Sequence, residues 1–405
     1  MMNCGIDIIE ISRIESAATK TPKFLEKTFS AEELEYFAKN GARIEILAGF
    51  FAAKEAFSKY MGTGISGFKL PEVSVGHTDK GAPFISFKGI RQEVALSISH
   101  DKTTAVAVVC AEQQVEAIPP LKAEMGALVP KRCQNSNKGD FGKSLIVAGS
   151  RGMTGAAVLS AYSALRTGSG LVTLATADSE RSIAASFYPE IMTAGLTSEN
   201  GIISSDAMGD ILKLAEGKDS IVFGPGLGRH PDITLILREL LQSYSGKIII
   251  DADGLNALSK DVGMLKAAIG EVILTPHPGE MSRLAGLTVE KIQRDRQKVA
   301  EAFAKEYGVC LVLKGFETVV SKEGYETFIN PTGNPGLATA GTGDVLSGVI
   351  AALVGQGLSG FDAAKLGVYI HGLAGDIAKE RLGVHGMIAS DVAMALPDAI
   401  RRLLK

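Results

Sequence analysis

Two patterns of hydrophobic positions divide the chain. The first pattern covers residues 1–112, where a strand-like segment, 4–11, precedes helical patterns at 30–40 and 45–61. Four short runs with the length and composition of strands follow. They are 72–78, 82–87, 95–100 and 104–111. This order predicts an α+β domain with several neighbouring strands.

The second pattern begins after residue 138, where apolar runs alternate with segments long enough for helices. The expected strands are 144–149, 170–176, 220–224, 247–252, 272–276 and 310–315. Such alternation favours βα units, and therefore an α/β domain with a doubly wound, mostly parallel sheet covered on both faces. Ligands of these folds gather beyond the carboxyl ends of the strands.

A polar stretch with a Pro-Pro pair lies between the two patterns. It predicts domains at 1–115 and 116–405, with 116–138 as the boundary region, although the part from Leu121 onward is expected to pack on the second domain. At 405 residues, the chain is long enough for two or three domains.

Composition and charge narrow the class of protein. Hydrophobic residues make up 46% and charged residues 21% of the chain, as in soluble globular proteins. The net charge is −3 and the Lys and Arg residues are scattered, so we expect no nucleic-acid partner. Acidic residues near the N-terminus, and a longest apolar stretch (345–355) well short of the roughly 20 residues of a membrane span, predict a cytoplasmic protein without a membrane segment.

The four cysteines, Cys4, Cys110, Cys133 and Cys310, form no C-x-x-C pair. Their separation argues against a zinc site or a disulfide framework and favours reduced thiols.

Several strand ends of the second domain are expected to terminate in unusual tails rich in Gly and Pro. The tails are "AGSRGMTGAA", "GPGLG", "DADGLNAL", "TPHPGE", "LKGFET" and "GNPGLATAGTGDVLSG". Any single tail is explained by ordinary turn chemistry. Six tails along one edge of a parallel sheet indicate a ligand site.

Asp344 is the carboxylate in the last of these tails. Gly341 and Gly343 allow a close approach of the backbone, and the apolar run after them predicts a helix whose first N–H groups would bind an anion. Asp344 could serve as the N-cap of that helix. We favour a catalytic role, because a carboxylate is unfavourable beside a phosphate site unless it has a function there, such as accepting a proton from a hydroxyl group.

In this order, the six tails resemble those of the nicotinamide-nucleotide-hydrate dehydratase family of the ribokinase-like superfamily, over about residues 120–405. "TPHPGE" together with "GNPGLATAGTGDVLSG" separates this family from sugar kinases. The resemblance implies ADP-dependent dehydration of NADHX and NADPHX, the hydrated forms of the reduced nicotinamide cofactors, to NADH and NADPH, with AMP and phosphate as the other products. The alternative is a small-molecule kinase of the same superfamily.

The resemblance also implies roles for individual residues. Asp344 would take the proton of the hydrate hydroxyl, and the hydrate would contact Ala156, Gly226 and His277 as well as Asp344. His277 alone is equally compatible with a structural role, and Asp253 and Asn256 stay outside the predicted set. The residues expected at the adenine nucleotide are Lys314, Gly315, Thr318, Asn334, Gly341, Thr342 and Gly343.

Fewer residues of the first domain suggest chemistry. Lys54, Glu55 and Lys59 lie among apolar neighbours, and Asp7 lies in an apolar strand, where an unpaired carboxylate is costly. Glu55 and Lys59 are one helical turn apart and could form a surface pair. A magnesium ion shared by Asp7 and Glu55 would offset the cost of both carboxylates.

"GIDIIEISRI", "FAAKEAFSKYMGTGI" and "SISH" resemble the holo-acyl-carrier-protein synthase family, the small phosphopantetheinyl transferases, over 1–112. The resemblance implies that Asp7 and Glu55 bind Mg²⁺ on coenzyme A. Lys59 would stabilise the leaving 3′,5′-ADP while a serine of acyl carrier protein attacks, and His100 would lie near coenzyme A as a possible base. Family members are typically trimers. Phe50 replaces the usual Arg, so a domain used only for assembly is the alternative.

Overall fold

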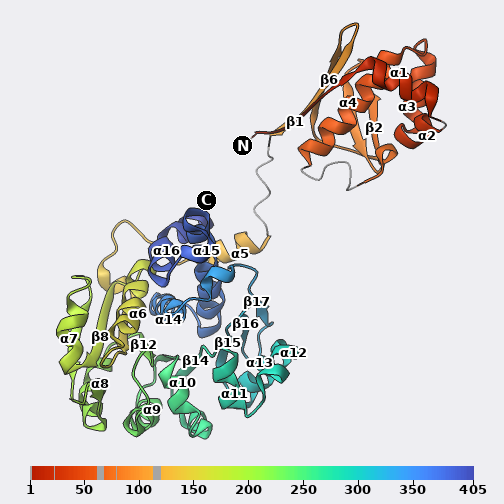
Figure 1. The fold of residues 1–405 in the computed structure, drawn as a ribbon. Helices are drawn as coiled ribbons and strands as arrows, with labels where there is room; N and C mark the ends of the chain where they lie inside the picture. Colours follow the sequence, from red (N-terminus) through yellow and green to blue (C-terminus); the bar gives the residue numbers. More distant parts are fainter. Residues whose placement is uncertain (1, 22, 62–67, 79, 113–119) are drawn as a thin grey trace. The chain divides into compact units, whose positions relative to one another are not determined.

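A computed structural model describes residues 2–21, 23–61, 68–78, 80–112 and 120–405 (Figure 1). The chain forms two compact units, Met1–Pro119 and Pro120–Lys405, and each is considered by itself below. The predicted order, an α+β domain followed by an α/β domain, is confirmed.

In its described residues, the first unit packs four α-helices and two antiparallel sheets around one core. The sheet orders are β1-β6-β5 and β2-β3-β4. The elements are β1 (Met2–Glu10), α1 (Ile11–Lys20), α2 (Phe24–Thr28), α3 (Ala31–Lys39), α4 (Ile44–Tyr60), β2 (Val73–His77), β3 (Pro83–Phe87), β4 (Ile90–Arg91), β5 (Ala95–His100) and β6 (Thr104–Glu112).

Helix α4 lies against one face of the sheet β1-β6-β5. The approach is so close that a Cβ on Gly5 would lie 2.0 Å from the carbonyl oxygen of Ala56. Side chains alternate between the faces of a strand, so Asp7 lies on the same face as Gly5. Its cross-strand partner, Ala107, is fully buried. The small residues therefore bring Asp7 to the surface of α4.

The opposite face of the same sheet carries exposed apolar side chains. Ile6 is 59% exposed and Ile8 is 68% exposed. Cys4 and Cys110 pair across β1 and β6, and their sulfur atoms are 2.6 Å apart although both are free thiols. Two of the four cysteines are therefore in contact, although they are far apart in the sequence.

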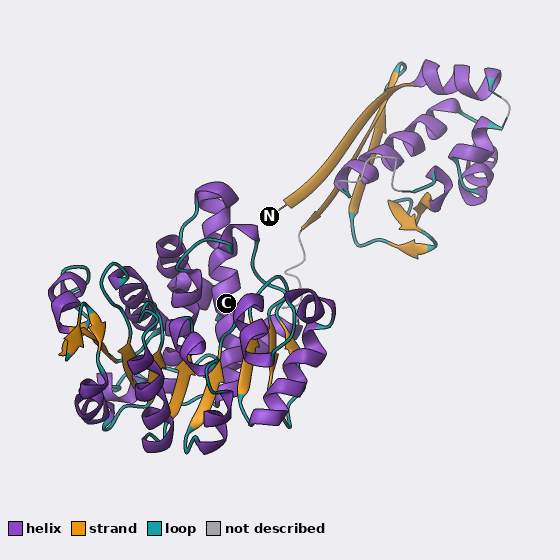
Figure 2. Ribbon diagram, turned by 60° about the horizontal axis from the view of Figure 1, so that its bottom comes forward, coloured by secondary structure: helices purple, strands orange, loops and turns teal. Residues whose placement is uncertain are grey.

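The second unit is built on a nine-stranded sheet in the order β17-β16-β15-β14-β13-β12-β7-β8-β9, with helices on both faces (Figure 2). The strands from β15 to β9 in this order are parallel, and β16 and β17 extend one edge antiparallel. The strands are β7 (Lys143–Val147), β8 (Leu171–Ala177), β9 (Met192–Leu196), β12 (Ser220–Phe223), β13 (Lys247–Ile250), β14 (Glu271–Leu274), β15 (Cys310–Leu313), β16 (Val319–Ser321) and β17 (Phe328–Ile329), with a separate hairpin of β10 (Ser198–Glu199) and β11 (Ile202–Ile203).

Alternating strand residues supply two cores, one on each face of the sheet. Ile146 and Val222 pack with α6, α14, α15 and α16, whereas Leu145 and Phe223 pack with α8 to α13. The helices are α5 (Pro120–Leu128), α6 (Thr154–Thr167), α7 (Asp178–Ala185), α8 (Met208–Ala215), α9 (Pro231–Ser243), α10 (Asp253–Leu258), α11 (Pro278–Ala285), α12 (Val289–Arg294), α13 (Arg296–Tyr307), α14 (Thr342–Gly355), α15 (Gly360–Gly386) and α16 (Ala389–Leu403).

Helix α14 is the central helix of the first of these cores. Its residues from Val345 to Val354 are all buried, because α14 packs against the sheet, α6 and α15. Gly348 permits the contact with α6, since a Cβ there would lie 2.0 Å from the carbonyl oxygen of Ser160. This packing fixes where the helix begins, and therefore where Asp344 lies.

Candidate active site

The tails after β13, β14 and β15 meet at one edge of the sheet. Backbone hydrogen bonds continue past the strands: Asp251 donates to Phe223 at 3.1 Å, Thr275 to Ile250 at 3.2 Å, and Lys314 to Pro276 at 2.8 Å. These backbone hydrogen bonds therefore hold the three tails next to one another.

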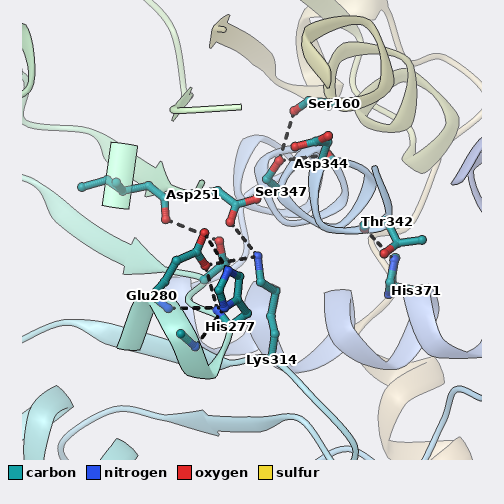
Figure 3. Close-up of polar contacts among 12 residues, drawn as sticks. Ser160, Asp251, His277, Glu280, Lys314, Thr342, Asp344, Ser347 and His371 are labelled. Carbon is teal, nitrogen blue, oxygen red and sulfur yellow. Dashed lines mark hydrogen bonds and ion pairs between the residues drawn. The ribbon is translucent and has the colours of Figure 1, made fainter. Parts of the chain in front are cut away.

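Lys314 joins two carboxylates at this edge (Figure 3). Its Nζ lies 2.7 Å from Oδ1 of Asp251 and 4.0 Å from Oε2 of Glu280, and both acids are buried. Burial raises the pKa of Glu280 to about 7, although the charge of Lys314 opposes the shift. A carboxyl group in this state exchanges its proton near neutral pH.

Asp344 is the third residue of α14, so it does not occupy the N-cap position, which belongs to Gly341. No hydrogen bond to its carboxylate is found among the described residues, and the capping alternative is therefore wrong. Burial raises the pKa of Asp344 to about 7, and the charge of Asp251 adds to the shift. The group has the proton affinity of a general base that works near neutral pH.

At two positions of the last tail, a side chain larger than that of glycine would be too close to its neighbours or would strain the backbone. A Cβ on Gly343 would lie 3.1 Å from Nζ of Lys314, so the first turn of α14 touches the lysine. Gly341 has φ of +91°, and a Cβ there would lie 2.7 Å from Leu159. The helix N-terminus and the lysine ammonium thus meet at one place, which suits a phosphate group.

A cavity of about 590 Å³ adjoins this turn. Its volume lies within the ordinary range of small-molecule sites, roughly 300–1,000 Å³. The ring of Phe316, 89% exposed, lies among the lining residues. All predicted nucleotide positions except Gly341 line this cavity, namely Lys314, Gly315, Thr318, Asn334, Thr342 and Gly343.

Internal hydrogen bonds shape the walls of the cavity. Asn334 accepts from the N–H of Gly336 and donates to Asp376, each at 3.0 Å. Nε2 of His371 lies 2.9 Å from the carbonyl oxygen of Thr342. Burial lowers the pKa of His371 to about 4, so the neutral ring donates this bond. Asn334 and His371 thus hold the cavity wall in place.

Two of the predicted hydrate positions, Ala156 and Gly226, lie against each other. Gly226 has φ of +62°, and a Cβ there would lie 3.2 Å from the Cβ of Ala156 and 2.8 Å from the carbonyl oxygen of Met153. Ser150 donates a 2.8 Å hydrogen bond to the carbonyl of Gly226. The tails after β7 and β12 therefore form one tightly packed floor.

His277 has the structural role that was one of the two alternatives left open by the sequence. Its Nδ1 accepts from the N–H of Gly279 at 3.0 Å and from that of Glu280 at 3.3 Å, which caps α11. With Nδ1 used as an acceptor, the neutral ring carries its proton on Nε2, 3.4 Å from Oε1 of Glu280. The side chain caps the helix and is 52% exposed, and its contact with the hydrate stays a prediction.

Comparison with known proteins adds to this geometry. The sequence model of the NAD(P)H-hydrate dehydratase family matches residues 144–398. The chain belongs to this family. The match favours the interpretation drawn from "TPHPGE" and the glycine-rich tail over the kinase alternative. A second sequence model, that of the 4′-phosphopantetheinyl transferase superfamily, matches residues 3–112, so both resemblances are confirmed.

Individual relatives of the dehydratase unit are similar over most of its length. A bifunctional NAD(P)H-hydrate repair enzyme of Moorella thermoacetica is 45% identical over 276 residues, 68% of this chain and 52% of the relative. An ADP-dependent (S)-NAD(P)H-hydrate dehydratase of Neisseria meningitidis is 38% identical over 65% of this chain and 86% of the relative. The chain spans about half the length of the bifunctional relatives it matches.

A solved structure shares the dehydratase fold. The ADP/ATP-dependent NAD(P)H-hydrate dehydratase of Bacillus subtilis, co-crystallised with ATP and Mg²⁺, has a TM-score of 0.60 and 29% identity. The similarity covers 70% of this chain and 97% of that structure.

Among the described residues, no helix combines the length and apolar character needed to cross a membrane.

Two acids of the dehydratase site, Asp251 and Glu280, were not predicted from the sequence. Both stand in tails that the sequence analysis identified, "DADGLNAL" and "TPHPGE". Their positions could have indicated them, because Asp251 directly follows a strand and Glu280 is three residues after a helix-capping residue. Asp253, which lay outside the predicted set, accepts from Gly228 at 2.9 Å and from Asn256 at 3.1 Å.

In the transferase-like unit, Asp7, Glu55 and Lys59 meet between β1 and α4. Nζ of Lys59 lies 2.8 Å from Oδ1 of Asp7 and 3.0 Å from the carbonyl oxygen of Ile6. Burial raises the pKa of Glu55, and the charge of Asp7 adds to the effect. Two facing carboxylates offer the oxygen ligands that Mg²⁺ prefers. No cluster of three or more metal-ligating side chains occurs among the described residues, so other ligands would come from phosphate or water.

Other residues of this unit have different places. His100 pairs with Ala105 at the end of β5, and its Nδ1 lies 3.3 Å from the carbonyl oxygen of Asp101. In the part of the chain that the structure describes, no hydrogen bond or ion pair joins His100 to Asp7, Glu55 or Lys59. Lys54 is a structural residue, since it forms a fully buried 2.7 Å ion pair with Glu33.

Phe50 stands where the transferase family usually has Arg. Its ring is buried in the core, 5.8 Å from the ring of Tyr36 and 5.9 Å from that of His77 between centroids. The position therefore supplies packing and no cation.

Proposed function

We propose that residues 120–405 catalyse the ADP-dependent dehydration of (6S)-NADHX and NADPHX to NADH and NADPH, with release of AMP and phosphate. One observation carries the proposal. Asp344, with a pKa of about 7, lies in the first turn of α14, near Lys314 and directly after Thr342 and Gly343 of the nucleotide-sized cavity. The family match and the packed floor of Ala156 and Gly226 support the same assignment.

The reaction starts with transfer of the terminal phosphoryl group of ADP to the C6 hydroxyl of the hydrate. The Asp344 carboxylate accepts the proton of this hydroxyl as the O–P bond forms and AMP leaves. Lys314 and the first N–H groups of α14 face the transferred group and stabilise its charge. When bound with ADP, Mg²⁺ would neutralise further phosphate charge.

Elimination completes the reaction. The ring nitrogen supplies the electron pair that expels phosphate from C6, and loss of the C5 proton then leaves the C5–C6 double bond of the dihydronicotinamide. Phosphate is a much better leaving group than hydroxide, so the phosphoryl transfer makes the dehydration possible. A kinase would instead retain the phosphate ester as its product.

The test is incubation of the full chain with NADHX and ADP, and in parallel with ATP. We expect the near-ultraviolet absorbance of the dihydronicotinamide ring to return, with one AMP and one phosphate released per NADH formed. No recovery with either nucleotide would overturn the proposal, and so would accumulation of a stable phosphorylated hydrate.

We further propose that residues 1–112 transfer 4′-phosphopantetheine from coenzyme A to a serine of acyl carrier protein. The 2.8 Å contact between Lys59 and Asp7, with Glu55 beside them, supports an assignment of Asp7 and Glu55 to Mg²⁺ and of Lys59 to the leaving 3′,5′-ADP. His100 remains a proposed base near coenzyme A.

Mass spectrometry of apo-acyl carrier protein after incubation with the full chain, coenzyme A and Mg²⁺ tests this second activity. We expect one added phosphopantetheine with the wild type and none with Glu55→Gln. Glu45→Gln, at the other end of the same helix, is the matched control and should retain transfer. If the wild type adds nothing, the domain has only an assembly role.

We propose a trimer as the oligomeric state of the chain. Ile6 and Ile8 place exposed apolar side chains on the sheet face opposite α4, which is costly unless another copy covers them. Light scattering should give the mass of three chains, and Ile8→Glu should lower it. A monomeric wild type would rule out this arrangement.

A further inference from the structure

Cys4 and Cys110 face each other on two paired strands of the first unit. β1 and β6 run side by side and antiparallel, and their register places Cys4 directly opposite Cys110 (Figure 1). The two Sγ atoms are 2.6 Å apart. Cysteine occupies four of the 405 positions. Cys4 is exposed and Cys110 is partly exposed, so packing in the core does not account for the pair.

The backbone at this pair already has the geometry of a disulfide. Directly opposed residues of antiparallel strands have Cα atoms roughly 4.5–5.5 Å apart, within the roughly 4.4–6.8 Å that disulfides span. A covalent S–S bond is roughly 2.0 Å long, so the sulfur atoms need only a small further approach. Both groups are free thiols in this structure, which shows that the unit folds without the bond.

The other two cysteines are in different surroundings. Cys133 is exposed, and Cys310 is fully buried, where burial raises the pKa of its thiol to about 12. Among the residues that the structure describes, no second pair of cysteines is in contact. The chain therefore has one pair of thiols that can join to each other without a rearrangement of the backbone.

The two paired thiols differ in reactivity. A hydrogen bond with Cys4 raises the pKa of the Cys110 thiol, so Cys110 keeps its proton more firmly than an ordinary cysteine. The thiolate is the form of cysteine that attacks an oxidant. Cys4, which is also the more exposed of the two, is therefore the sulfur expected to react first.

We propose that Cys4 and Cys110 form a reversible oxidation site, at which hydrogen peroxide converts the two thiols into a disulfide that fastens the start of β1 to β6. The Cys4 sulfur attacks one peroxide oxygen, the O–O bond breaks, and a sulfenic acid and one water form. Sγ of Cys110 then attacks Sγ of Cys4 and displaces the remaining oxygen as a second water, which takes up the Cys110 proton. The sulfur atoms lose two electrons in total, and the peroxide gains them. Exchange with a small dithiol restores both thiols.

The bond acts on an edge strand. In the sheet order β1-β6-β5, β6 is the one strand that pairs with β1 among the described residues. Cys4 lies near the start of β1, three residues before Asp7. The two cysteines are 106 positions apart, so the bond also closes a long loop and restricts the unfolded chain. Oxidation therefore opposes separation of β1 from the sheet.

Treatment of the full-length Cys133→Ser variant with hydrogen peroxide tests the proposal. This variant lacks the exposed single thiol and keeps three cysteines. We expect titration of the unfolded product to find one thiol in place of three, and peptide mass spectrometry to find Cys4 linked to Cys110. A dithiol should restore all three thiols. Cys110→Ser in the same background is the matched control and should give no cross-link within the chain.

Hydrogen exchange measures the effect on the strand. Deuterium uptake by peptides that cover residues 2–10 should be slower in the oxidised Cys133→Ser chain than in the reduced one, and uptake by peptides of the second unit should not change. The control with Cys110→Ser should show no such difference. Absence of the cross-linked peptide, oxidation that a dithiol cannot reverse, or equal uptake by β1 in the two states would each overturn the proposal.

Discussion

Lys314 and Asp251 form a 2.7 Å ion pair at the point where β15 and β13 end. Burial alone would lower the pKa of Lys314, but the charges of Asp251 and Glu280 outweigh it, and the net effect raises that pKa. One ammonium group thus faces several carboxyl groups. Because the lysine charge cannot neutralise all of them, Glu280 and Asp344 keep protons up to about pH 7.

Asp344→Asn should lower the rate of dehydration by about 10²- to 10⁴-fold, because the amide cannot accept the hydroxyl proton. Binding of ADP should change little, since no hydrogen bond from the Asp344 side chain holds the cavity walls among the described residues. The rate of dihydronicotinamide recovery and calorimetry with ADP measure the two effects. Asp206→Asn, at an exposed site, should leave both values unchanged. A rate for Asp344→Asn within about tenfold of the wild type would contradict the assignment as a base.

The kcat/KM of dehydration should fall about tenfold for each pH unit below about 7, as Asp344 becomes protonated and loses its function as a base. Asp251→Asn removes a negative charge that raises the pKa of Asp344. The acid limb of the pH profile should therefore move to lower pH in this variant. Kinetics between about pH 5 and 9 measure the shift, and an unmoved or alkaline-shifted limb would contradict the charge argument.

Glu280→Gln should stabilise the chain at neutral pH. The pKa of Glu280 is about 7 in the folded chain and near its ordinary, lower value after unfolding, so the wild type loses stability as pH rises between these values. The gain should be absent near pH 4 and reach roughly 3 kcal/mol above pH 7. Urea unfolding followed by circular dichroism measures it. Glu239→Gln, on the exposed face of α9, is the control. An equal gain in stability for Glu280→Gln near pH 4 and above pH 7 would show that the raised pKa of Glu280 is not the reason for the gain.

Lys54→Met should lower the free energy of unfolding of the first unit by about 3–5 kcal/mol, because it leaves the buried Glu33 carboxylate without its ion-pair partner. Adding Glu33→Gln should restore part of this loss. Lys39→Met removes an exposed pair with Glu35 and should cost less than about 1 kcal/mol. Denaturant titrations of the full chain provide the comparison. Equal losses for the two lysines would show that burial of the pair is unimportant.

Phe316→Ala should raise the KM for ADP several-fold and leave the KM for the hydrates unchanged. The ring is 89% exposed and lines the proposed nucleotide cavity, where an aromatic face can stack on adenine. Phe187→Ala removes another exposed ring, 53% accessible, that lies outside that cavity's lining and should have no effect. An unchanged KM for ADP in Phe316→Ala would exclude stacking on this ring.

The longest apolar runs predicted the fold well, and short edge elements were missed. The six expected strands of the second unit all form, because each is continuously apolar and buried on both faces. The sequence analysis did not predict β9, β16 and β17. β16 and β17 have three and two residues, and pairing with the neighbouring strand decides their state.

By itself, the sequence determined both fold classes and the order of the strand-end tails, and it indicated Asp344 and the glycines before it. These features are local, since they follow from hydrophobic period, turn chemistry and motif order. Only the tertiary structure decided that Asp251, Glu280 and Lys314 form one charged cluster and that Lys54 belongs to the core. Such facts depend on distances between segments far apart in the chain. Burial then changes the proton affinity of the side chains that it brings together.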